Sequence, residues 1–323
     1  MTEMPLQTRS GFAAILGAPN AGKSTLTNAL VGEKISIVTH KVQTTRFQIR
    51  AIAMLETKEG HSAQIVLVDT PGIFAPKEKD RLAKSMVHAA WTGADDANLT
   101  VHVVDAPAWL RHRDGDGNAQ DRLAAEDTQR VQKGLSRRGS KTFLVLNKVD
   151  EIAHDKLLPL IAHFNETKLY AEVFPVSAKN GEGVKALSEA LAEEMPIGPY
   201  LYPPDQAADI PTRLMAAEIT REKLFLRLHD EIPYASMVET ENWQEKKDGS
   251  VKIEQVIYVR RDSQKSIVLG KGGRAIKDIG ASARKDMCEW LGRKVHLFLF
   301  VKVRANWKDD QARYAGTGLE FDV

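Results

Sequence analysis

A nine-residue segment near the start of the chain restricts the fold more than any other feature. Residues 17–25 are a full match to the pattern G-x-x-x-x-G-K-[ST]. The match follows an apolar, strand-like run at residues 12–16 and opens a helical stretch at residues 23–31, which is the context that the pattern requires. Glycines let backbone N–H groups approach phosphate oxygens, while the lysine and the serine can bind further phosphate oxygens and Mg²⁺. The sequence therefore predicts a phosphate-binding loop made of Gly17, Ala18, Pro19, Asn20, Ala21, Gly22, Lys23, Ser24 and Thr25.

Short apolar runs alternate with helical stretches up to about residue 195. This alternation predicts an α/β domain with a mostly parallel sheet. Ligand loops are then expected at the carboxyl ends of the strands. Further strands are expected at residues 51–55, 65–69, 99–105, 142–147 and 173–177, with helices at residues 81–92 and 183–194.

Three more motifs each follow one of these strands. Asp69-Thr70-Pro71-Gly72 offers a carboxylate that acts on Mg²⁺ through water and a glycine that can turn toward the γ-phosphate. Asn147-Lys148-Val149-Asp150 offers a carboxylate that can accept two hydrogen bonds from guanine but not from adenine. The third, Ser177-Ala178-Lys179, has backbone groups that can support the guanine O6. Four motifs in this order predict a GTP-hydrolysing domain, with GTP and GDP as ligands.

Four positions bear on hydrolysis. Thr44 and Thr45 lie in a polar stretch where a threonine can complete the Mg²⁺ shell when the γ-phosphate is present. Ile73 stands where Ras-like switch proteins carry a water-orienting glutamine, so slow intrinsic turnover is expected. Asn20 resembles the asparagine that holds a potassium ion in some GTPases lacking that glutamine. We expect Lys23, Thr45 and Gly72 to act in catalysis, Ser24, Thr44, Thr45 and Asp69 to hold Mg²⁺, and K⁺ to be a second candidate cation.

Composition and charge point to a cytoplasmic, two-domain protein. The chain has 323 residues with 43% hydrophobic and 27% charged, which is ordinary for soluble domains. One cysteine cannot form an internal disulfide, and no apolar run approaches the length of a membrane span. The net charge of +2 conceals an asymmetry, because residues 255–308 carry 13 Lys or Arg against 4 Asp or Glu. Such clustering is typical of proteins that bind polyanions.

Prolines mark the domain boundary. Five of them lie between residues 195 and 211, a density that predicts an extended connector. We therefore expect a nucleotide domain at 1–195, a linker at 196–212, a second domain at 213–308 and a tail at 309–323. In the second domain a helix is expected at 274–291, and the strand at 295–303 is expected to be buried on both faces for most of its length.

The basic second domain contains a G-x-x-G loop between two helices, the device with which KH domains hold a nucleic-acid backbone. The pattern is weak alone, and the flanking apolar residues and the local charge strengthen it. The expected RNA-binding residues are Gly270, Lys271, Gly272, Gly273, Arg274 and Lys277.

With both halves considered, residues 11–307 closely resemble the Era GTPase family. The resemblance is carried by residues 17–26, 35–37, 43–46, 69–72, 147–150, 221–224, 233–234 and 283–287. It implies a smaller α+β KH domain of type II, binding near the 3′ end of small-subunit (16S) ribosomal RNA and a role in small ribosomal subunit assembly. It also implies peripheral, reversible contact with the inner face of the cell membrane. We further expect a monomer.

Two alternatives remain open at this stage. The chain can be a passive RNA-binding scaffold, or a GTPase that acts on another RNA such as tRNA. Residues 107–118 look longer and more charged than the family usually has, and we expect a surface insertion without mechanistic consequence. We also expect nucleotide and RNA binding to be coupled through a reorientation at the proline-rich connector.

Overall fold

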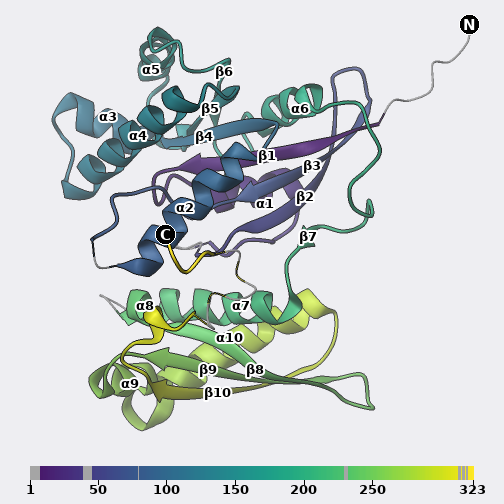
Figure 1. Cartoon of the computed structure of the whole chain (residues 1–323), viewed down its shortest axis with the longest axis vertical. Coiled ribbons are helices and arrows are strands. Elements are labelled where there is room, and N and C mark those ends of the chain that lie inside the picture. Colours follow the sequence, from purple (N-terminus) through teal and green to yellow (C-terminus); the bar gives the residue numbers. More distant parts are fainter. Residues whose placement is uncertain are drawn as a thin grey trace, which may run out of the picture. The chain divides into compact units, whose positions relative to one another are not determined.

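The chain folds into two compact units (Figure 1). This computed structural model describes residues 8–38, 46–78, 80–228, 232–311, 314, 317 and 319–323. Unit 1 comprises residues up to 209 together with those from 318 onward, and unit 2 comprises residues 210–317.

Unit 1 is built on a seven-stranded sheet, with the strand order β6-β5-β4-β1-β3-β2-β7. Neighbouring strands from β6 to β3 are parallel, whereas β2 and β7 run antiparallel to their neighbours. The predicted mostly parallel α/β sheet is confirmed. The strands are β1 (Arg9–Gly17), β2 (Ile49–Glu56), β3 (Ser62–Asp69), β4 (Leu99–Asp105), β5 (Thr142–Asn147), β6 (Glu172–Val176) and β7 (Ala208–Asp209).

Helices cover both faces of this sheet. Helices α1 and α6 contact one another and strands β2 and β3, while α2 and α4 contact β1. Ala14 and Leu16 of β1 are fully buried against α2 and α4, and this core holds the strand that leads into the phosphate loop. The helices are α1 (Lys23–Val31), α2 (Arg81–Asp95), α3 (Ala106–Asp114), α4 (Ala119–Arg138), η1 (Val149–Glu151), α5 (His154–Glu166) and α6 (Val184–Glu194).

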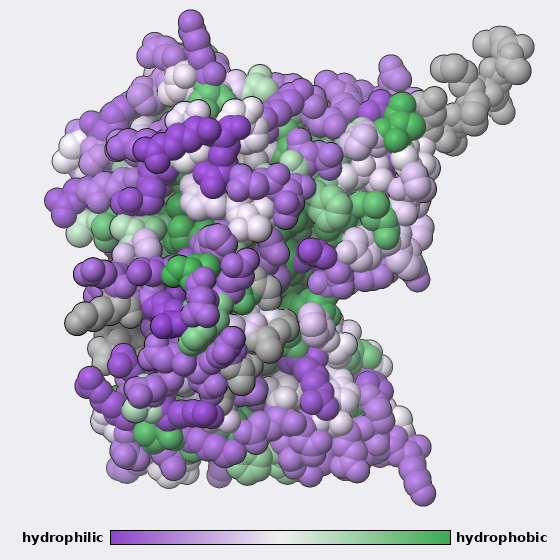
Figure 2. Space-filling view, in the orientation of Figure 1, coloured by the Kyte–Doolittle hydropathy of each residue, from purple (hydrophilic) through white to green (hydrophobic). Residues whose placement is uncertain are grey.

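The predicted surface insertion at residues 107–118 is largely helix α3, and the expectation that it lies on the surface is wrong for its first turn. Pro107, Ala108, Trp109 and Leu110 are buried. Ala106, Trp109 and Leu110 pack in one apolar cluster with residues of β4, β5 and α5. The charged residues of the segment come after this apolar turn, so composition alone concealed it. Where Figure 2 shows α3 and α4, their outer faces are mostly hydrophilic.

The proline-rich connector is attached to unit 1 along much of its length. The buried Gln64 side chain of β3 donates to the Tyr202 carbonyl (2.8 Å) and accepts from the N–H groups of Leu201 (2.7 Å) and Tyr202 (2.9 Å). Farther on, β7 pairs with β2 at Arg50 and Ala51. The chain therefore leaves unit 1 from a strand joined to β2, the element that follows residues 39–45.

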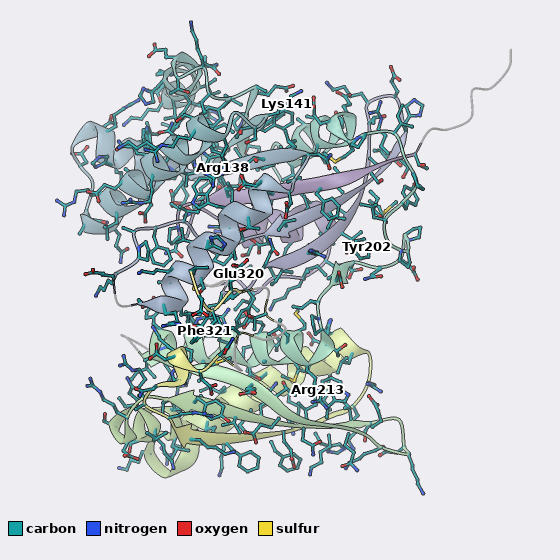
Figure 3. The ribbon with its side chains drawn as sticks, in the orientation of Figure 1. Arg138, Lys141, Tyr202, Arg213, Glu320 and Phe321 are labelled. Carbon is teal, nitrogen blue, oxygen red and sulfur yellow. The ribbon has the colours of Figure 1, made fainter. Side chains whose placement is uncertain are left out.

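The C-terminal residues also belong to unit 1 and pack on α2 (Figure 3). The Arg81 guanidinium lies 4.2 Å from the centre of the Phe321 ring and 3.1 Å from Asp322 Oδ1. About two turns farther along the helix, His88 Nε2 lies 3.5 Å from Glu320 Oε2. In the sequence, unit 2 therefore lies between two segments of unit 1.

Unit 2 is an α+β domain with a three-stranded sheet in the order β10-β9-β8. Strands β10 and β9 are parallel, and β8 is antiparallel to β9. One face of the sheet packs against α7 and α10 through an apolar cluster that includes Ile219, Ile253 and Met287. The elements are α7 (Thr212–Arg227), α8 (Ile232–Ala235), β8 (Met237–Glu245), β9 (Val251–Val259), α9 (Asp262–Leu269), η2 (Lys271–Gly273), α10 (Arg274–Leu291), β10 (Val295–Val303) and η3 (Trp307–Asp309).

The expectation that residues 295–303 form a strand buried on both faces is wrong. Strand β10 is at the edge of its sheet, and only one of its faces packs against helices. On the other face Phe298 is 47% exposed and Phe300 is 50% exposed. The apolar run is continuous because aromatic residues also lie on the open face of the sheet, so it does not indicate burial of both faces.

Candidate nucleotide and RNA sites

The loop between β1 and α1 wraps around the ammonium group of Lys23. Lys23 Nζ donates to the carbonyl oxygens of Gly17 (3.1 Å) and Ala18 (2.9 Å). Burial lowers the pKa of Lys23 to about 8, although the nearby Asp69 and Asp127 carboxylates act in the opposite direction. Gly22 has φ +94°, and a Cβ there would lie 2.1 Å from Asn147 Nδ2, so glycine is required both for the backbone conformation and for space.

The predicted Mg²⁺ ligands that the structure describes offer hard oxygen donors. Ser24 begins α1 beside Lys23 and lines the same pocket, and Asp69 ends β3 with its side chain fully buried. A hydroxyl and a carboxylate suit Mg²⁺, which keeps water and phosphate oxygens as its remaining ligands. Thr44 and Thr45 lie outside the described residues.

The segment after Asp69 closes against the phosphate loop. Thr70 Oγ1 donates to the Ile15 carbonyl (2.7 Å), and the Ile73 N–H donates to the Gly17 carbonyl (3.0 Å). A Cβ at Gly72 would lie 2.9 Å from Pro19 Cα, so the two loops meet too closely for any other residue. The Ile73 side chain is fully buried in the core beneath α2 and cannot orient a water at the phosphates.

Asn147 joins three of the predicted motifs. Its buried side chain donates through Nδ2 to the Ala21 carbonyl (2.8 Å) and accepts at Oδ1 from the Ala178 N–H (3.0 Å). Lys148 follows with a left-handed backbone (φ +66°), which turns the chain from β5 into η1 and places Asp150 at the pocket. A single amide therefore fixes the phosphate loop relative to both guanine-reading loops.

These loops surround one pocket of about 470 Å³. Most of the predicted nucleotide-binding residues line this pocket. The predicted residues that are not part of its lining are Gly17, Ala18, Ala21, Asp69, Thr70 and Pro71. The sequence reasoning missed four lining residues, of which only Ile37 lay in a segment that the family resemblance had drawn attention to. The lining residues are Pro19, Asn20, Gly22, Lys23, Ser24, Thr25, Ile37, Val38, Gly72, Gln120, Asn147, Lys148, Asp150, Glu151, Ser177, Ala178 and Lys179.

A buried histidine lies in the sheet beside the phosphate-loop strand. His102 of β4 is paired in register with Leu16 and is fully buried. A hydrogen bond of 2.8 Å joins its Nδ1 and the Tyr170 hydroxyl. Burial lowers the pKa of His102 to about 3, and the positive charge of Lys23 acts in the same direction. The imidazole is therefore neutral at physiological pH.

In unit 2 the G-x-x-G loop joins α9 to α10 as predicted. Gly270, Gly272 and Gly273 have φ values of +70°, +63° and +74°, which favour glycine. A Cβ at Gly270 would lie 2.9 Å from the Ala275 nitrogen, whereas those at Gly272 and Gly273 would meet nothing within 4 Å. The last two glycines thus leave open space next to backbone N–H groups, which a nucleic-acid phosphate can approach. The predicted side chains Lys271, Arg274 and Lys277 are exposed around this loop.

Comparison with known proteins identifies the family. A family model described as "50S ribosome-binding GTPase" matches residues 12–148, and the KH domain model matches residues 231–308. The chain is 56% identical to GTPase Era of Maricaulis maris over 315 residues, which covers 98% of both chains. The chain belongs to the Era GTPase family. It is also 52% identical to GTPase Era of Caulobacter vibrioides over the full length of both proteins.

Solved Era structures share the fold of both units. Era in complex with MgGDPNP and nucleotides 1506–1542 of 16S ribosomal RNA gives a TM-score of 0.85 at 32% identity and covers 96% of this chain and 99% of that one. Aquifex aeolicus Era Y63A bound to GDP.AlF4⁻ gives the same values. The predicted combination of a P-loop GTPase domain and a KH domain is confirmed. Among the described helices, none is both long and apolar enough to cross a bilayer.

Proposed function

We propose that this chain is a GTP-hydrolysing switch that binds small-subunit ribosomal RNA near its 3′ end through the KH domain and acts in small ribosomal subunit assembly. The similarity to the Era structure holding MgGDPNP and a 16S ribosomal RNA fragment carries this proposal, because it extends over 96% of the chain. The pocket geometry supports the GTPase part, since the phosphate, metal and guanine motifs surround one cavity. Because all of these motifs are present, a passive RNA-binding scaffold without GTPase activity is disfavoured.

In the proposed mechanism each loop has one role. The backbone N–H groups of the phosphate loop and the Lys23 ammonium bind the phosphates, and Gly72 lets a backbone N–H approach the γ-phosphate. Ser24 and Asp69, with Thr44 or Thr45, would hold Mg²⁺, which neutralises phosphate charge when bound. The Asp150 carboxylate selects guanine. The donor types support these roles, and so does the lining of one pocket by Lys23, Ser24, Gly72 and Asp150.

A second cation is part of the proposal. Asn20 lines the pocket with a left-handed backbone (φ +63°), and Ile73 cannot replace the missing glutamine. A potassium ion held by Asn20 would neutralise charge that develops during hydrolysis. We expect faster turnover in potassium than in sodium buffer at equal ionic strength, and equal rates would contradict a potassium site.

We also propose that nucleotide and RNA binding are coupled. Strand β2 follows residues 39–45 and pairs with β7, after which the chain enters unit 2. A change at residues 39–45 or after Gly72 can therefore reach the connector through paired backbone. Linkage requires that GTP strengthen RNA binding by the same factor by which RNA strengthens GTP binding.

The decisive experiment measures the affinity of the full chain for an RNA containing nucleotides 1506–1542 of 16S ribosomal RNA. The protein is loaded with a non-hydrolysable GTP analogue or with GDP, and GTP turnover is followed in parallel. We expect tighter RNA binding with the analogue. Identical affinities would contradict coupling, absence of RNA binding would contradict the rRNA assignment, and absence of turnover would contradict the GTPase assignment. A cellular crosslinking experiment that recovered tRNA instead would favour the alternative substrate.

Location and assembly complete the proposal. We propose a cytoplasmic monomer with peripheral contact to the inner membrane face, the contact resting on the family resemblance alone. Light scattering of the purified protein tests the monomer. Co-flotation with vesicles of bacterial lipids tests the membrane contact, and a protein that stays entirely at the bottom of the gradient would contradict it.

A further inference from the structure

Asp105 ends β4 at the same sheet edge as the nucleotide pocket, yet it belongs to none of the phosphate or guanine motifs. In the sheet register Asp105 lies beside Asn147, the last residue of β5. The next residue along the chain is Lys148, whose side chain lines the pocket. The sheet register thus brings a carboxylate next to a guanine-site lysine.

The two oxygens of the Asp105 carboxylate have separate partners. Oδ1 accepts a hydrogen bond from the Ala108 N–H (3.0 Å) and so caps the N-terminus of α3. Oδ2 accepts from Lys148 Nζ at 2.5 Å. The Asp105 side chain is only 13% exposed and that of Lys148 is 30% exposed, so water screens this ion pair less than a fully exposed one.

Helix α3 keeps the carboxylate in place. Trp109 is buried in the cluster below β4 and β5, which fixes the backbone that carries Ala108. The Arg111 guanidinium binds both oxygens of Asp121 at 3.1 and 2.7 Å and thereby joins α3 to α4. Gln120, in the first turn of α4, itself lines the pocket. These contacts join α3 to β4 and β5 and to α4, the helix that carries Gln120.

Holding the Lys148 side chain in one conformation should strengthen nucleotide binding. A lysine that is free before binding loses conformational entropy when a ligand orders it, so ordering it in advance strengthens binding. Lys148 lines the pocket together with Asp150. The apolar methylene groups of a lysine can contact a planar base there. An ion pair at the far end holds those methylene groups in position.

We propose that Asp105 is a positioning residue for guanine nucleotide binding, which holds Lys148 through an ion pair and is itself oriented by α3. The inference rests on the proposed function, because it takes a guanine nucleotide as the ligand. It also assigns a role to the segment that was expected to have no mechanistic consequence.

The test substitutes Asp105→Asn in the full chain. The amide oxygen can still accept from Ala108, but the charge is lost and an amide nitrogen can face the lysine ammonium. We expect the Kd for fluorescently labelled GDP and the KM for GTP to rise about tenfold, with kcat within about twofold of wild type. Asp105→Glu keeps the charge and should restore most of the affinity. Asp114→Asn is the matched control on α3, because Asp114 pairs with Lys156 and does not line the pocket, and it should bind GDP like wild type.

A double-mutant cycle separates the ion pair from a general effect on folding. In a Lys148→Met background, Asp105→Asn should cause no further loss of GDP affinity, because the pair is already absent. The positioning role would be overturned if the two substitutions together lowered GDP affinity by the product of their separate effects. It would also be overturned if Asp105→Asn left GDP affinity unchanged, or if it lowered kcat by as much as it raised KM. The GDP-binding measurements do not depend on turnover, so a wild-type protein that bound GDP without hydrolysing GTP would contradict the proposed function and leave this inference standing.

Discussion

Replacing His102 with Asn should make the free energy of unfolding depend less on pH. The imidazole is fully buried in β4, and its Nδ1 has one observed partner, the Tyr170 hydroxyl. An Asn side chain can place an amide group near the Nδ1 position but takes up no proton in this range. The substitution removes ring volume, so we expect His102→Asn to be less stable than wild type at pH 7.

The magnitude follows from the two pKa values of this group. The unfolded chain protonates His102 near pH 6.5, whereas burial keeps the folded chain unprotonated down to about pH 3. Between these values the unfolded state binds more protons, so stability increases with pH and is lost as the pH falls. From pH 7 to pH 5 the contribution of His102 to this loss is about 2 kcal/mol.

The assay is urea unfolding of nucleotide-free protein at pH 7, 6 and 5 at fixed ionic strength. The free energy of unfolding is compared between wild type and His102→Asn at each pH, so that contributions from all other groups cancel. The gap should shrink by about 2 kcal/mol between pH 7 and pH 5. His154→Asn, at an exposed position in the first turn of α5, is the control and should follow wild type. Curves for His102→Asn and wild type that stay parallel would refute the buried, neutral imidazole.

Three further predictions test the two sites. Asp150→Asn should weaken GTP binding by more than about a hundredfold and shift preference toward xanthosine triphosphate, because an amide can pair with a 2-oxo group; competition binding measures this, and unchanged GTP affinity would contradict the base-reading role. Lys271→Asp combined with Gly272→Asp should abolish RNA binding in a filter assay and leave basal GTP turnover near wild type, because the loop and the pocket lie in different units. GDP should bind about fourfold more weakly at pH 8.5 than at pH 7, since the Lys23 pKa of about 8 means that binding at higher pH requires protonation of the amine; a flat titration by calorimetry would contradict that pKa.

The sequence was sufficient for strands β1 to β6 and for the loops at their carboxyl ends, whereas β7 lies in the predicted connector. Residues 17–25, 69–72 and 147–150 are short motifs whose spacing from apolar runs fixes the strand ends, and parallel strands bring those ends to one edge. The structure accordingly places Lys23, Gly72 and Asp150 around one pocket. Local pattern and tertiary arrangement agree here because the backbone of each loop contributes directly to the site.

Other features of the fold and of the site could not be predicted, because they depend on contacts between residues far apart in the sequence. Nothing in the sequence near Gln120 or Asp105 indicates a role at the pocket. Gln120 lines it from α4, which packs against α3, and Asp105 contacts the pocket residue Lys148, which the β4–β5 register brings close to it. The exposure of Phe298 depends on whether a helix covers that face of β10, which an apolar run does not specify. Separate boundaries at residues 195 and 213 remain predictions, because the family matches end at 148 and resume at 231.

The position of the last residues on α2 has a consequence for how the protein is made. Unit 1 includes Glu320, Phe321 and Asp322, whose partners Arg81 and His88 are translated more than two hundred residues earlier. Domains fold in order from the N-terminus during synthesis, so the sheet of unit 1 can form while unit 2 is still being translated. The contacts on α2 can form only after residues 320–322 have been translated. Unit 1 therefore gains its full set of contacts only after all of unit 2 has been translated.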